Sequence, residues 1–512
     1  MTNETVCPHW EIMEIDYSAI LKADRIRRNA AAASGTVLSK SENDRGRILF
    51  SPAFRRLRQE MHGFSVNANA TIGSNFSHCL QVSQIGRVIA NRIATQLAAG
   101  NFVDANQSAA LVNFVDSACL LRNIGNPPFG RAGKAAIQRW FVERGADMVR
   151  AACKSYGGRE ITASDPRLVQ ALTDFYEFDG NPQGLRVIAK LKWSTEPNGL
   201  NLTKTTIASY LKYLRMAGAE PAPSERFTEK AGFFSTEAGL LKSIWSEFGY
   251  SAAAPQRFPL AYIVEAAEKI GGCLCDLEDA IETQVLRQRE AIAAVRESWL
   301  SSYIPTDPDP VDDQIVGIFN DGVNGKNRAG EEFGYADFRA ALISALSDYA
   351  ARRYLDQHDA AFNGKLDSLL PSESGAGAIL AALKDYCKQH VYRHPLVQQN
   401  ELSGYATIYG LLQHFALLLT CSTERFQAAL DATLDRDRYG VSLFAEQKLL
   451  SLIPDEYIGV YSHAVAQIGN AGGRDAEFEE WNTRAHLVVD FVAGMTDAFA
   501  VSTYRTLAGL HL

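Results

Sequence analysis

Residues 75–97 read NFSHCLQVSQIGRVIANRIATQL, and this stretch decides the class of fold. Within it, apolar residues recur at spacings of three and four positions, at Val82, Ile85, Ile89, Ile93 and Leu97. Because an α-helix has about 3.6 residues per turn, this spacing places all of them on one face. The stretch is therefore predicted to form a long helix with one buried face.

The same helical periodicity recurs along most of the chain. It is clearest in the stretches 109–121, 258–285, 336–354, 379–391, 403–419 and 483–500. Alternating apolar and polar residues, which would indicate β-strands, are scarce. Runs rich in Pro, Gly, Asp and Asn interrupt the helical stretches, and the longest lies at 303–334. We therefore predict an all-α protein with minor β additions.

Composition narrows the functional classes. With 46% hydrophobic and 21% charged residues in a chain of 512, wholesale disorder is excluded. No apolar run approaches the ~18 residues that a membrane span needs, and no secretory leader is visible. We therefore expect a soluble, cytoplasmic protein that does not contact a membrane. The net charge of −8 disfavours a protein that coats nucleic acid, but it is compatible with a local basic groove.

Three segments carry a resemblance to a known family. They are DRGRILFSPAFRRLRQ at 44–59, NFSHCLQVSQIGRVIA at 75–90 and ACLLRNIGNPPFGRAGKAAIQRWF at 118–141. In this order they resemble the HD-domain deoxynucleoside triphosphate triphosphohydrolases, in particular the long bacterial dGTPase type. Further blocks continue the match in register, at 178–186, 210–213, 265–280 and 490–500. The resemblance covers nearly the whole chain, so it implies an HD-domain helical core.

The resemblance also implies a division of the chain and a set of partners. We expect an N-terminal segment at 1–39, an HD-domain-like core at 40–290, a loop-rich connection at 291–335 and a helical C-terminal region at 336–512. Members of this family act on dNTPs, commonly form homohexamers or other closed oligomers, and bind single-stranded DNA at subunit interfaces. The expected partners are therefore a nucleotide, single-stranded DNA and further copies of the chain.

The family's chemistry defines which residues to look for. A divalent metal, Mg or Mn, is held by a His, a His-Asp pair and a distant Asp. It aligns a water for attack near the α-phosphate, and the products are a deoxynucleoside and tripolyphosphate. Imidazole and carboxylate groups suit such an ion because they supply neutral nitrogen and anionic oxygen donors. A further His and Glu, just after the His-Asp pair, handle protons or position the substrate.

This chain departs from that pattern. The first ligand is retained as His78, and Glu268 matches the last one. Arg122 and Asn123 stand where the His-Asp pair belongs. A guanidinium does not deprotonate in proteins, so it cannot act as a ligand and would repel a cation. We therefore expect no bound metal unless the family's activity persists, with His78 and Glu268 as remnants of the ligand set.

The neighbouring family positions have changed as well. Arg131 replaces the additional His, and Lys134 replaces the additional Glu. Relative to the family, the formal charge at the site shifts by about five units toward positive. His62 matches the Gln that contacts the sugar, and Gly272 matches the Tyr that stacks near it. No catalytic group is expected to be intact, and the degenerate positions are Arg122, Asn123, Arg131 and Lys134.

Other family positions around this site are retained. The loop IGNPPFG at 124–130 is intact, and Asn181, Lys212 and Tyr213 match positions that contact phosphate or lie beside it. Asp276 follows Glu268 by eight residues, which places it on the same helical face. An Arg–Arg–Lys cluster suits phosphate oxygens, through bidentate guanidinium contacts and a point charge. The predicted ligand-binding set is Arg122, Arg131, Lys134, Asn181, Lys212, Tyr213, Asp276 and His62.

Three hypotheses follow from these residues. In the first, the protein is a catalytically degenerate homologue that binds a nucleotide or single-stranded nucleic acid in a metal-free positive pocket, or that regulates an active partner. In the second, it is a dNTP triphosphohydrolase with altered or metal-independent chemistry. In the third, which is compatible with the first, Arg122 pairs with Glu268 in a structural salt bridge. We favour the first over the second because no visible group would generate a hydroxide nucleophile.

A basic stretch near the N-terminus raises the question of nucleic-acid binding. It runs from Lys22 to Arg58, and apolar residues interrupt it. A solvated helix face or an interface is therefore favoured over a nucleic-acid patch. The family precedent of single-stranded DNA binding keeps the second interpretation open.

Overall fold

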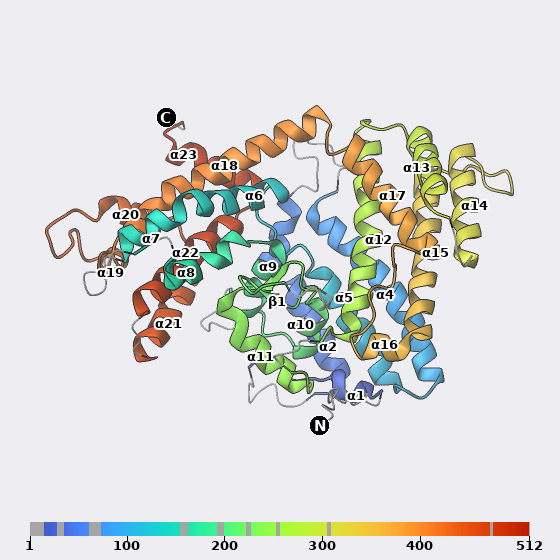
Figure 1. The fold of residues 1–512 in the computed structure, drawn as a ribbon, viewed down its shortest axis with the longest axis horizontal. Helices are drawn as coiled ribbons and strands as arrows, with labels where there is room; N and C mark the ends of the chain where they lie inside the picture. Colours follow the sequence, from blue (N-terminus) through green and yellow to red (C-terminus); the bar gives the residue numbers. More distant parts are fainter. Residues whose placement is uncertain are drawn as a thin grey trace, which may run out of the picture.

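The computed structural model describes most of the chain. The described residues are 15–27, 35–60, 73–153, 161–162, 164–191, 199–221, 227–251, 256–304, 309–471 and 475–510. Helices dominate this part of the protein (Figure 1), and its strands are β1 (Arg215–Met216) and β2 (Ala231–Phe233), which pair in parallel. The prediction of an all-α fold with minor β additions is confirmed.

Most of the elements that surround the site lie in the part of the chain from residue 17 to residue 282. Its helices are α1 (Tyr17–Ile20), α2 (Val37–Leu49), α3 (Pro52–Arg56), η2 (Leu57–Gln59), α4 (Asn75–Ala99), α5 (Ala105–Leu120), α6 (Arg131–Trp140), η3 (Phe141–Gly145), α7 (Ala146–Ala152), α8 (Pro166–Tyr176), α9 (Gly180–Ala189), α10 (Lys204–Tyr210), η5 (Ser235–Glu237), α11 (Ala238–Glu247) and α12 (Pro259–Glu282). In this series η2 and η5 are 3-10 helices and η3 is a π-helix.

The second half of the described chain is helical as well. Its helices are α13 (Gln288–Ser302), α14 (Pro310–Asn324), α15 (Tyr335–Asp356), α16 (His358–Phe362), α17 (Gly375–His390), α18 (Pro395–Thr420), α19 (Thr423–Leu430), α20 (Phe444–Leu450), α21 (Asp455–Ala471), α22 (Ala476–Ala493) and α23 (Asp497–Leu507). These helices extend the molecule to both ends of its long axis (Figure 1).

The first hydrophobic core forms around α4. Ser74 begins this helix because its side chain accepts a hydrogen bond from the backbone amide of Ser77. The predicted apolar face is buried, and the helix packs against α5, α12 and α15. The prediction for residues 75–97 is therefore confirmed. Helices α13 to α17, at the right of Figure 1, belong to the same core.

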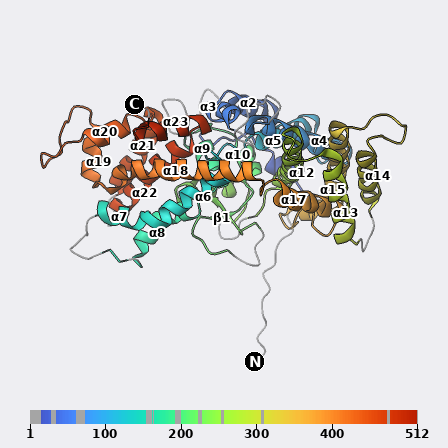
Figure 2. The ribbon, with the colours of Figure 1, turned by 90° about the horizontal axis from the view of Figure 1, so that it is seen from above.

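The second core lies on the other side of the molecule. Trp140 of α6, Phe175 of α8 and Trp481 of α22 are fully or almost fully buried in it. Figure 2 shows α18 alongside α6, and these two helices pack against each other. Each of the two cores combines residues from 40–290 with residues from 336–512.

A glycine contact joins the loop 124–130 to α9. A Cβ atom at Gly125 would lie 2.0 Å from the backbone nitrogen of Gly184, and one at Gly180 would lie 2.3 Å from the side-chain oxygen of Asn126. Only residues without a Cβ allow the two backbones to approach so closely. The loop is therefore held directly against the first turns of α9.

Two sequence expectations differ from the structure. The stretch 483–500 forms two helices, α22 and α23, which meet at an angle of 114° because Gly494 ends the first and Thr496 caps the second. The stretch 291–335, expected to be rich in loops, contains most of α13 and all of α14. Pro310 and Asp309 suggested a loop, but Pro in a first turn and Asp at the N-cap are also the residues that begin helices.

One described helix, α18, is long and apolar enough to cross a membrane by length and composition, and the bent pair α22 and α23 also meets that test. Half of the apolar window of α18 is buried inside the protein. Its buried residues include Ile408, Leu411 and Phe415, which belong to the second core.

Candidate functional site

A cavity of about 530 Å³ lies where the two cores meet. Eight of the residues singled out from the sequence line it: Arg122, Asn123, Arg131, Lys134, Asn181, Glu268, Gly272 and Asp276. They come from the turn after α5, the start of α6, the start of α9 and the middle of α12. The fold therefore brings most of the predicted site together.

The loop between α5 and α6 forms one wall of this cavity. Phe129 and Gly130 both have positive φ angles, of 60° and 50°, which turn the chain sharply into α6. The backbone amide of Phe129 donates to Asp497 of α23 at 2.9 Å. Because α6 begins at Arg131, the side chains of Arg131 and Lys134 lie on its first turn and line the cavity.

Arg122 forms an ion pair with Glu268 at the back of the cavity. Its Nη2 atom lies 2.8 Å from Oε2 of Glu268, and Nζ of Lys212 lies 3.1 Å from the same oxygen. Burial would raise the pKa of Glu268, but the charges of Arg122 and Lys212 outweigh it and lower that pKa to about 2. Two cations therefore share one ionised carboxylate.

Further contacts fix the guanidinium of Arg122 in this position. Its side chain is almost fully buried, with 5% exposed. It donates to the backbone oxygen of Tyr210 at 3.3 Å and to Oδ1 of Asn181 at 3.2 Å, and it lies over the Tyr210 ring. The structural salt bridge with Glu268 is therefore present, as the third hypothesis predicts.

Lys134 contacts a carboxylate that also begins α9. Its ammonium group pairs with Asp179, whose side chain accepts from the backbone amide of Asn181 at 3.0 Å and caps the helix. Burial raises the pKa of Asp179, but the charge of Lys134 and the hydrogen bonds outweigh that effect and lower the pKa. The lysine therefore lies at the cavity wall with its charge compensated.

Arg131 has a more open environment. Its side chain is 62% exposed, and its guanidinium lies 3.0 Å from a carboxylate oxygen of Glu401 and 4.0 Å from the centre of the Tyr392 ring. The Tyr392 hydroxyl donates in turn to Asp276. Arg122, Arg131 and Lys134, which were predicted to form a positive pocket, thus each contact a carboxylate.

The remaining predicted positions have different surroundings. Lys212 reaches Glu268 from beside the cavity, and its ammonium lies 5.6 Å from the centre of the buried Tyr213 ring. At Gly272 a Cβ atom would meet no atom within 4 Å, so this part of the cavity wall is open. His62 lies outside the described residues.

The residues at the family's ligand positions do not suit a divalent cation. His78 is buried in α4. The side-chain amide of Asn123 donates a hydrogen bond to Asn75 and accepts one from Asn126. The guanidinium of Arg122, always charged, already contacts the carboxylate of Glu268. Within the described ranges, no three His, Cys, Asp or Glu side chains converge in a way that could hold an ion. This donor set does not fit the family's metal.

Several residues of the cavity were not singled out from the sequence. Asn126 belongs to the IGNPPFG loop, so its place in that motif could have indicated it. Others include Asn75, Lys230, Tyr392, Glu401 and Asp497. Most of these reach the cavity through long-range packing, which leaves no local signal in the sequence.

Three arginines of the N-terminal basic stretch pair with buried carboxylates. Arg25 lies 2.6 Å from the buried carboxylate of Asp44, and Nε of Arg45 lies 2.8 Å from the buried carboxylate of Asp116. Arg56 pairs with a buried glutamate in the same way. These ion pairs stabilise the packing of the N-terminal helices, and the side chain of Arg45 is at the same time 44% exposed to solvent.

Comparisons with known proteins agree with this architecture. A family model described as a phosphohydrolase-associated domain matches residues 460–506. The deoxyguanosinetriphosphate triphosphohydrolase of Enterobacter sp. (strain 638) is 31% identical over 496 residues, which cover 93% of this chain and 95% of that protein. The enzyme of the same name from Cronobacter sakazakii (strain ATCC BAA-894) is 30% identical with the same coverage. That from Serratia proteamaculans (strain 568) is also 30% identical and covers 92% of this chain.

Identity at this level over nearly the full length of both proteins implies a shared fold and descent. The chain belongs to the deoxyguanosinetriphosphate triphosphohydrolase family.

Proposed function

We propose that this protein binds a deoxynucleoside triphosphate in the 530 Å³ cavity without a metal and does not hydrolyse it by the family's route. The observation that carries the proposal is the ion pair of Arg122 with Glu268, at 2.8 Å. This pair places a cation and its counter-ion at two of the four positions that match the family's metal ligands. Arg122 and Lys212 thus neutralise the carboxylate that a metal would otherwise neutralise.

The geometry divides the predicted cations into two groups. Arg122 and Lys212 are engaged with Glu268 at the back of the cavity, so we assign them a structural role. Arg131 and Lys134 lie nearer the solvent, with 62% and 31% of their side chains exposed. We therefore assign phosphate binding to Arg131 and Lys134, with Lys230 in the same wall as a third cation.

A phosphate group can compete for these side chains. The exposed pair of Arg131 with Glu401 is worth only about 0–1 kcal/mol, so exchanging the carboxylate for a triphosphate costs little. Charge-assisted bonds to phosphate oxygens are stronger, and those to a guanidinium can be bidentate. The first-turn amides of α6, beside Arg131, add partial positive charge.

The test measures the binding of dGTP to the purified full chain by calorimetry, in the presence of EDTA. We expect wild-type protein to bind, and Lys134→Gln and Arg131→Gln each to weaken binding by about 10-fold or more. Arg139→Gln is the matched control, because Arg139 lies on the same helix and is also paired with a carboxylate, Glu143, but is absent from the cavity wall. An absence of dGTP binding at low salt would overturn the proposal.

The comparisons favour a second candidate. The printed names of the relatives describe dGTP triphosphohydrolases, and the chain matches them along 93% of its length. The protein would then convert dGTP to deoxyguanosine and tripolyphosphate by altered or metal-independent chemistry. Tripolyphosphate release that survives EDTA and disappears in Arg122→Ala would support this candidate. Release that needs Mg²⁺ or Mn²⁺ at an ordinary rate would contradict the main proposal and our reading of the ligand positions.

Assembly and nucleic-acid binding complete the proposal. We propose that the chain forms a closed homo-oligomer, as most soluble oligomers do, and that single-stranded DNA is a further ligand. The charged residues of the N-terminal helices give little support to the second part, since Arg25 and Arg45 already pair with the buried carboxylates of Asp44 and Asp116. Light scattering of the full chain and titration with a short labelled oligonucleotide test the two parts separately.

A further inference from the structure

A surface groove of about 470 Å³ adjoins the cavity at the start of α6. Arg131, Tyr392 and Glu401 line both spaces, so the cavity opens directly into the groove. The other walls of the groove come from the end of α17, from the turn that follows it and from the first half of α18. Ligand pockets span ~300–1,000 Å³, so the cavity and the groove are each large enough for one nucleoside.

The unpaired cations lie in the groove rather than in the cavity. Lys388 and Arg393 are exposed, and neither forms an ion pair or a hydrogen bond within the described part of the chain. Together with Arg131 they give the groove three cations against one carboxylate, that of Glu401. The cavity wall holds four cations and five carboxylates. The groove is therefore the more positive part of the combined space, and the part that attracts a chain of phosphates.

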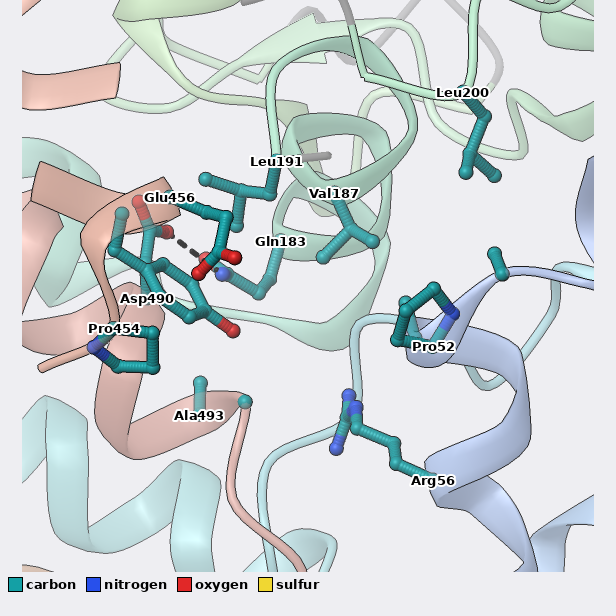
Figure 3. A pocket seen from close by; sticks show the side chains of 14 residues that line it. Pro52, Arg56, Gln183, Val187, Leu191, Leu200, Pro454, Glu456, Asp490 and Ala493 are labelled. Carbon is teal, nitrogen blue, oxygen red and sulfur yellow. Dashed lines mark hydrogen bonds between the residues drawn. The ribbon is translucent and has the colours of Figure 1, made fainter. Parts of the chain in front are cut away.

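Arg56 provides the contrast, because its donors are already used by the protein. It lines a smaller pocket of about 240 Å³ between α3, α9, α21 and α22 (Figure 3). Its Nη2 atom donates to two backbone oxygens of the 124–130 loop, and its Nη1 atom contacts Glu60 and the backbone oxygen of Met495. That pocket therefore offers no free cation, whereas the groove offers two.

The groove also has a surface on which a base can stack. Tyr405 lines it, half-buried, with its ring stacked on that of Tyr409. Leu402, three residues earlier on the same face of α18, lines the groove with 69% of its surface exposed. Aromatic rings hold bases by stacking, whichever base is present. The groove thus combines free cations with a stacking surface, which are the two features that a nucleotide requires.

The arrangement constrains the shape of a ligand that fills both spaces. Arg131 stands at their junction, so the charged part of such a ligand must lie in its middle. A dNTP carries its phosphates at one end, and with its nucleoside in the cavity it would leave Tyr405 uncovered. A dinucleoside polyphosphate has a nucleoside at each end and the phosphate chain between them.

We propose that the cavity and the groove together bind a dinucleoside polyphosphate. One nucleoside lies in the cavity, the phosphate chain contacts Arg131, Lys388 and Arg393, and the second nucleoside stacks on Tyr405. This inference rests on the function proposed above, because the cavity must accept a nucleotide. Glu401 opposes binding, since it pairs with Arg131 and carries the same charge as the phosphates.

The first experiment compares two ligands with the same number of phosphates, diguanosine tetraphosphate and guanosine 5′-tetraphosphate. Calorimetry of the full chain in EDTA should show one site per chain, with the dinucleoside bound ~10-fold more tightly or better. Tyr405→Ala should remove this difference. Tyr405→Phe, which keeps the ring, is the matched control and should retain it.

The second experiment tests the cations of the groove. Lys388→Gln and Arg393→Gln should each weaken binding of diguanosine tetraphosphate by ~5-fold or more and leave dGTP binding within ~2-fold of the wild type. Lys384→Gln, an exposed lysine of α17 outside the groove, is the matched control and should change neither. Glu401→Gln should strengthen binding of the tetraphosphate, a gain that damage to the fold would not produce.

The outcomes separate this inference from the function proposed above. If dGTP binds but the two tetraphosphate ligands bind equally well, or the groove variants change nothing, this inference is overturned and the proposed function stands. Equally tight binding of the dinucleotide dGpdG would assign the groove to nucleic acid and overturn it as well. If diguanosine tetraphosphate binds through Lys388 while dGTP does not bind, the groove is supported and dGTP is the wrong ligand. If neither binds at low salt, both proposals fail.

Discussion

At the residue scale, the central feature is one carboxylate shared by two cations. Arg122 and Lys212 both contact Oε2 of Glu268, so the three residues are unequal partners. Without Arg122, Glu268 still has Lys212. Without Glu268, two cations face each other with no counter-ion in contact. This asymmetry can be measured.

We expect Glu268→Gln to lower the free energy of unfolding by about 3–5 kcal/mol, because it leaves buried Arg122 uncompensated. Arg122→Gln should cost less, about 1–3 kcal/mol, since Lys212 still neutralises the carboxylate. Urea denaturation measures both values. Glu282→Gln, at the exposed end of the same helix, should have an effect near zero. Equal losses in the two cavity variants would contradict the shared arrangement.

Glu268 also makes the free energy of unfolding depend on pH. Because the pKa of Glu268 is lowered from 4.5 to about 2, its ionised form stabilises the folded state at pH values above 4.5. This stabilisation is lost as the pH falls from 4.5 through 2, and it amounts to up to ~3 kcal/mol. Urea unfolding between pH 6 and pH 2.5 should therefore lose less free energy in Glu268→Gln than in the wild type. Parallel curves for the two proteins would show that the carboxylate is not stabilised by its neighbours.

The sequence could predict part of this arrangement. The replacement of the His-Asp pair by Arg122 and Asn123 was visible, and so was a pair of Arg122 with Glu268. The participation of Lys212 was not, because it depends on how the segment after α10 packs against α12. Nor could the sequence show that Asp179 and Glu401 compensate Lys134 and Arg131, since these partners are distant in the chain.

At the scale of elements, the contact between the 124–130 loop and α9 positions the site. Gly125 is essential to it, because any side chain there would overlap the backbone of Gly184. We expect Gly125→Ala to lower the free energy of unfolding by more than ~2 kcal/mol, since the loop must move away from the helix. Gly46→Ala is the matched control. Gly46 lies within α2 with open space around it, so alanine should stabilise by about 0.5–1 kcal/mol.

Thermal unfolding and dGTP binding should both be measured for these two variants. Loss of dGTP affinity in Gly125→Ala, but not in Gly46→Ala, would show that the loop places the binding groups. An unchanged stability in Gly125→Ala would contradict the close backbone contact.

Periodicity predicted the long helices well, because each has one face in a core. It did not predict the break between α22 and α23, since apolar residues continue through Gly494 and Met495 at helical spacing. The break depends on Thr496, which caps α23, and on Tyr457, whose hydroxyl leaves no room for a side chain at Gly494. The cap is a local signal, whereas the contact with Tyr457 is a tertiary effect that a local pattern does not report.

At the scale of the whole molecule, two hydrophobic cores meet at the cavity and are linked by a buried ion pair. Arg186 of α9, beside residues of the first core, lies 2.8 Å from Asp490 of α22, in the second. Both side chains are almost fully buried. The two cores are therefore expected to unfold together only while this pair is intact.

Asp490→Asn tests this connection. We expect scanning calorimetry to show one transition for the wild type and a broadened or divided transition for the variant, with a loss of about 3 kcal/mol. The loss is limited because Glu237 still lies 3.3 Å from Arg186. Glu479→Gln, on the exposed face of the same helix, should unfold like the wild type. A single sharp transition in Asp490→Asn would show that the cores are coupled by other contacts.

The ion pair of Arg122 with Glu268 also constrains how this protein can evolve. Restoring a histidine at position 122 alone removes a cation from a buried carboxylate and leaves Asn123, so it costs stability and regains no ligand set. Changing Glu268 first costs more stability, because Arg122 and Lys212 then lose their shared counter-ion. Both of these single steps toward the family's ligand set pass through a less stable protein. Selection for folding alone is therefore sufficient to keep the pair, even in lineages in which the cavity has no ligand.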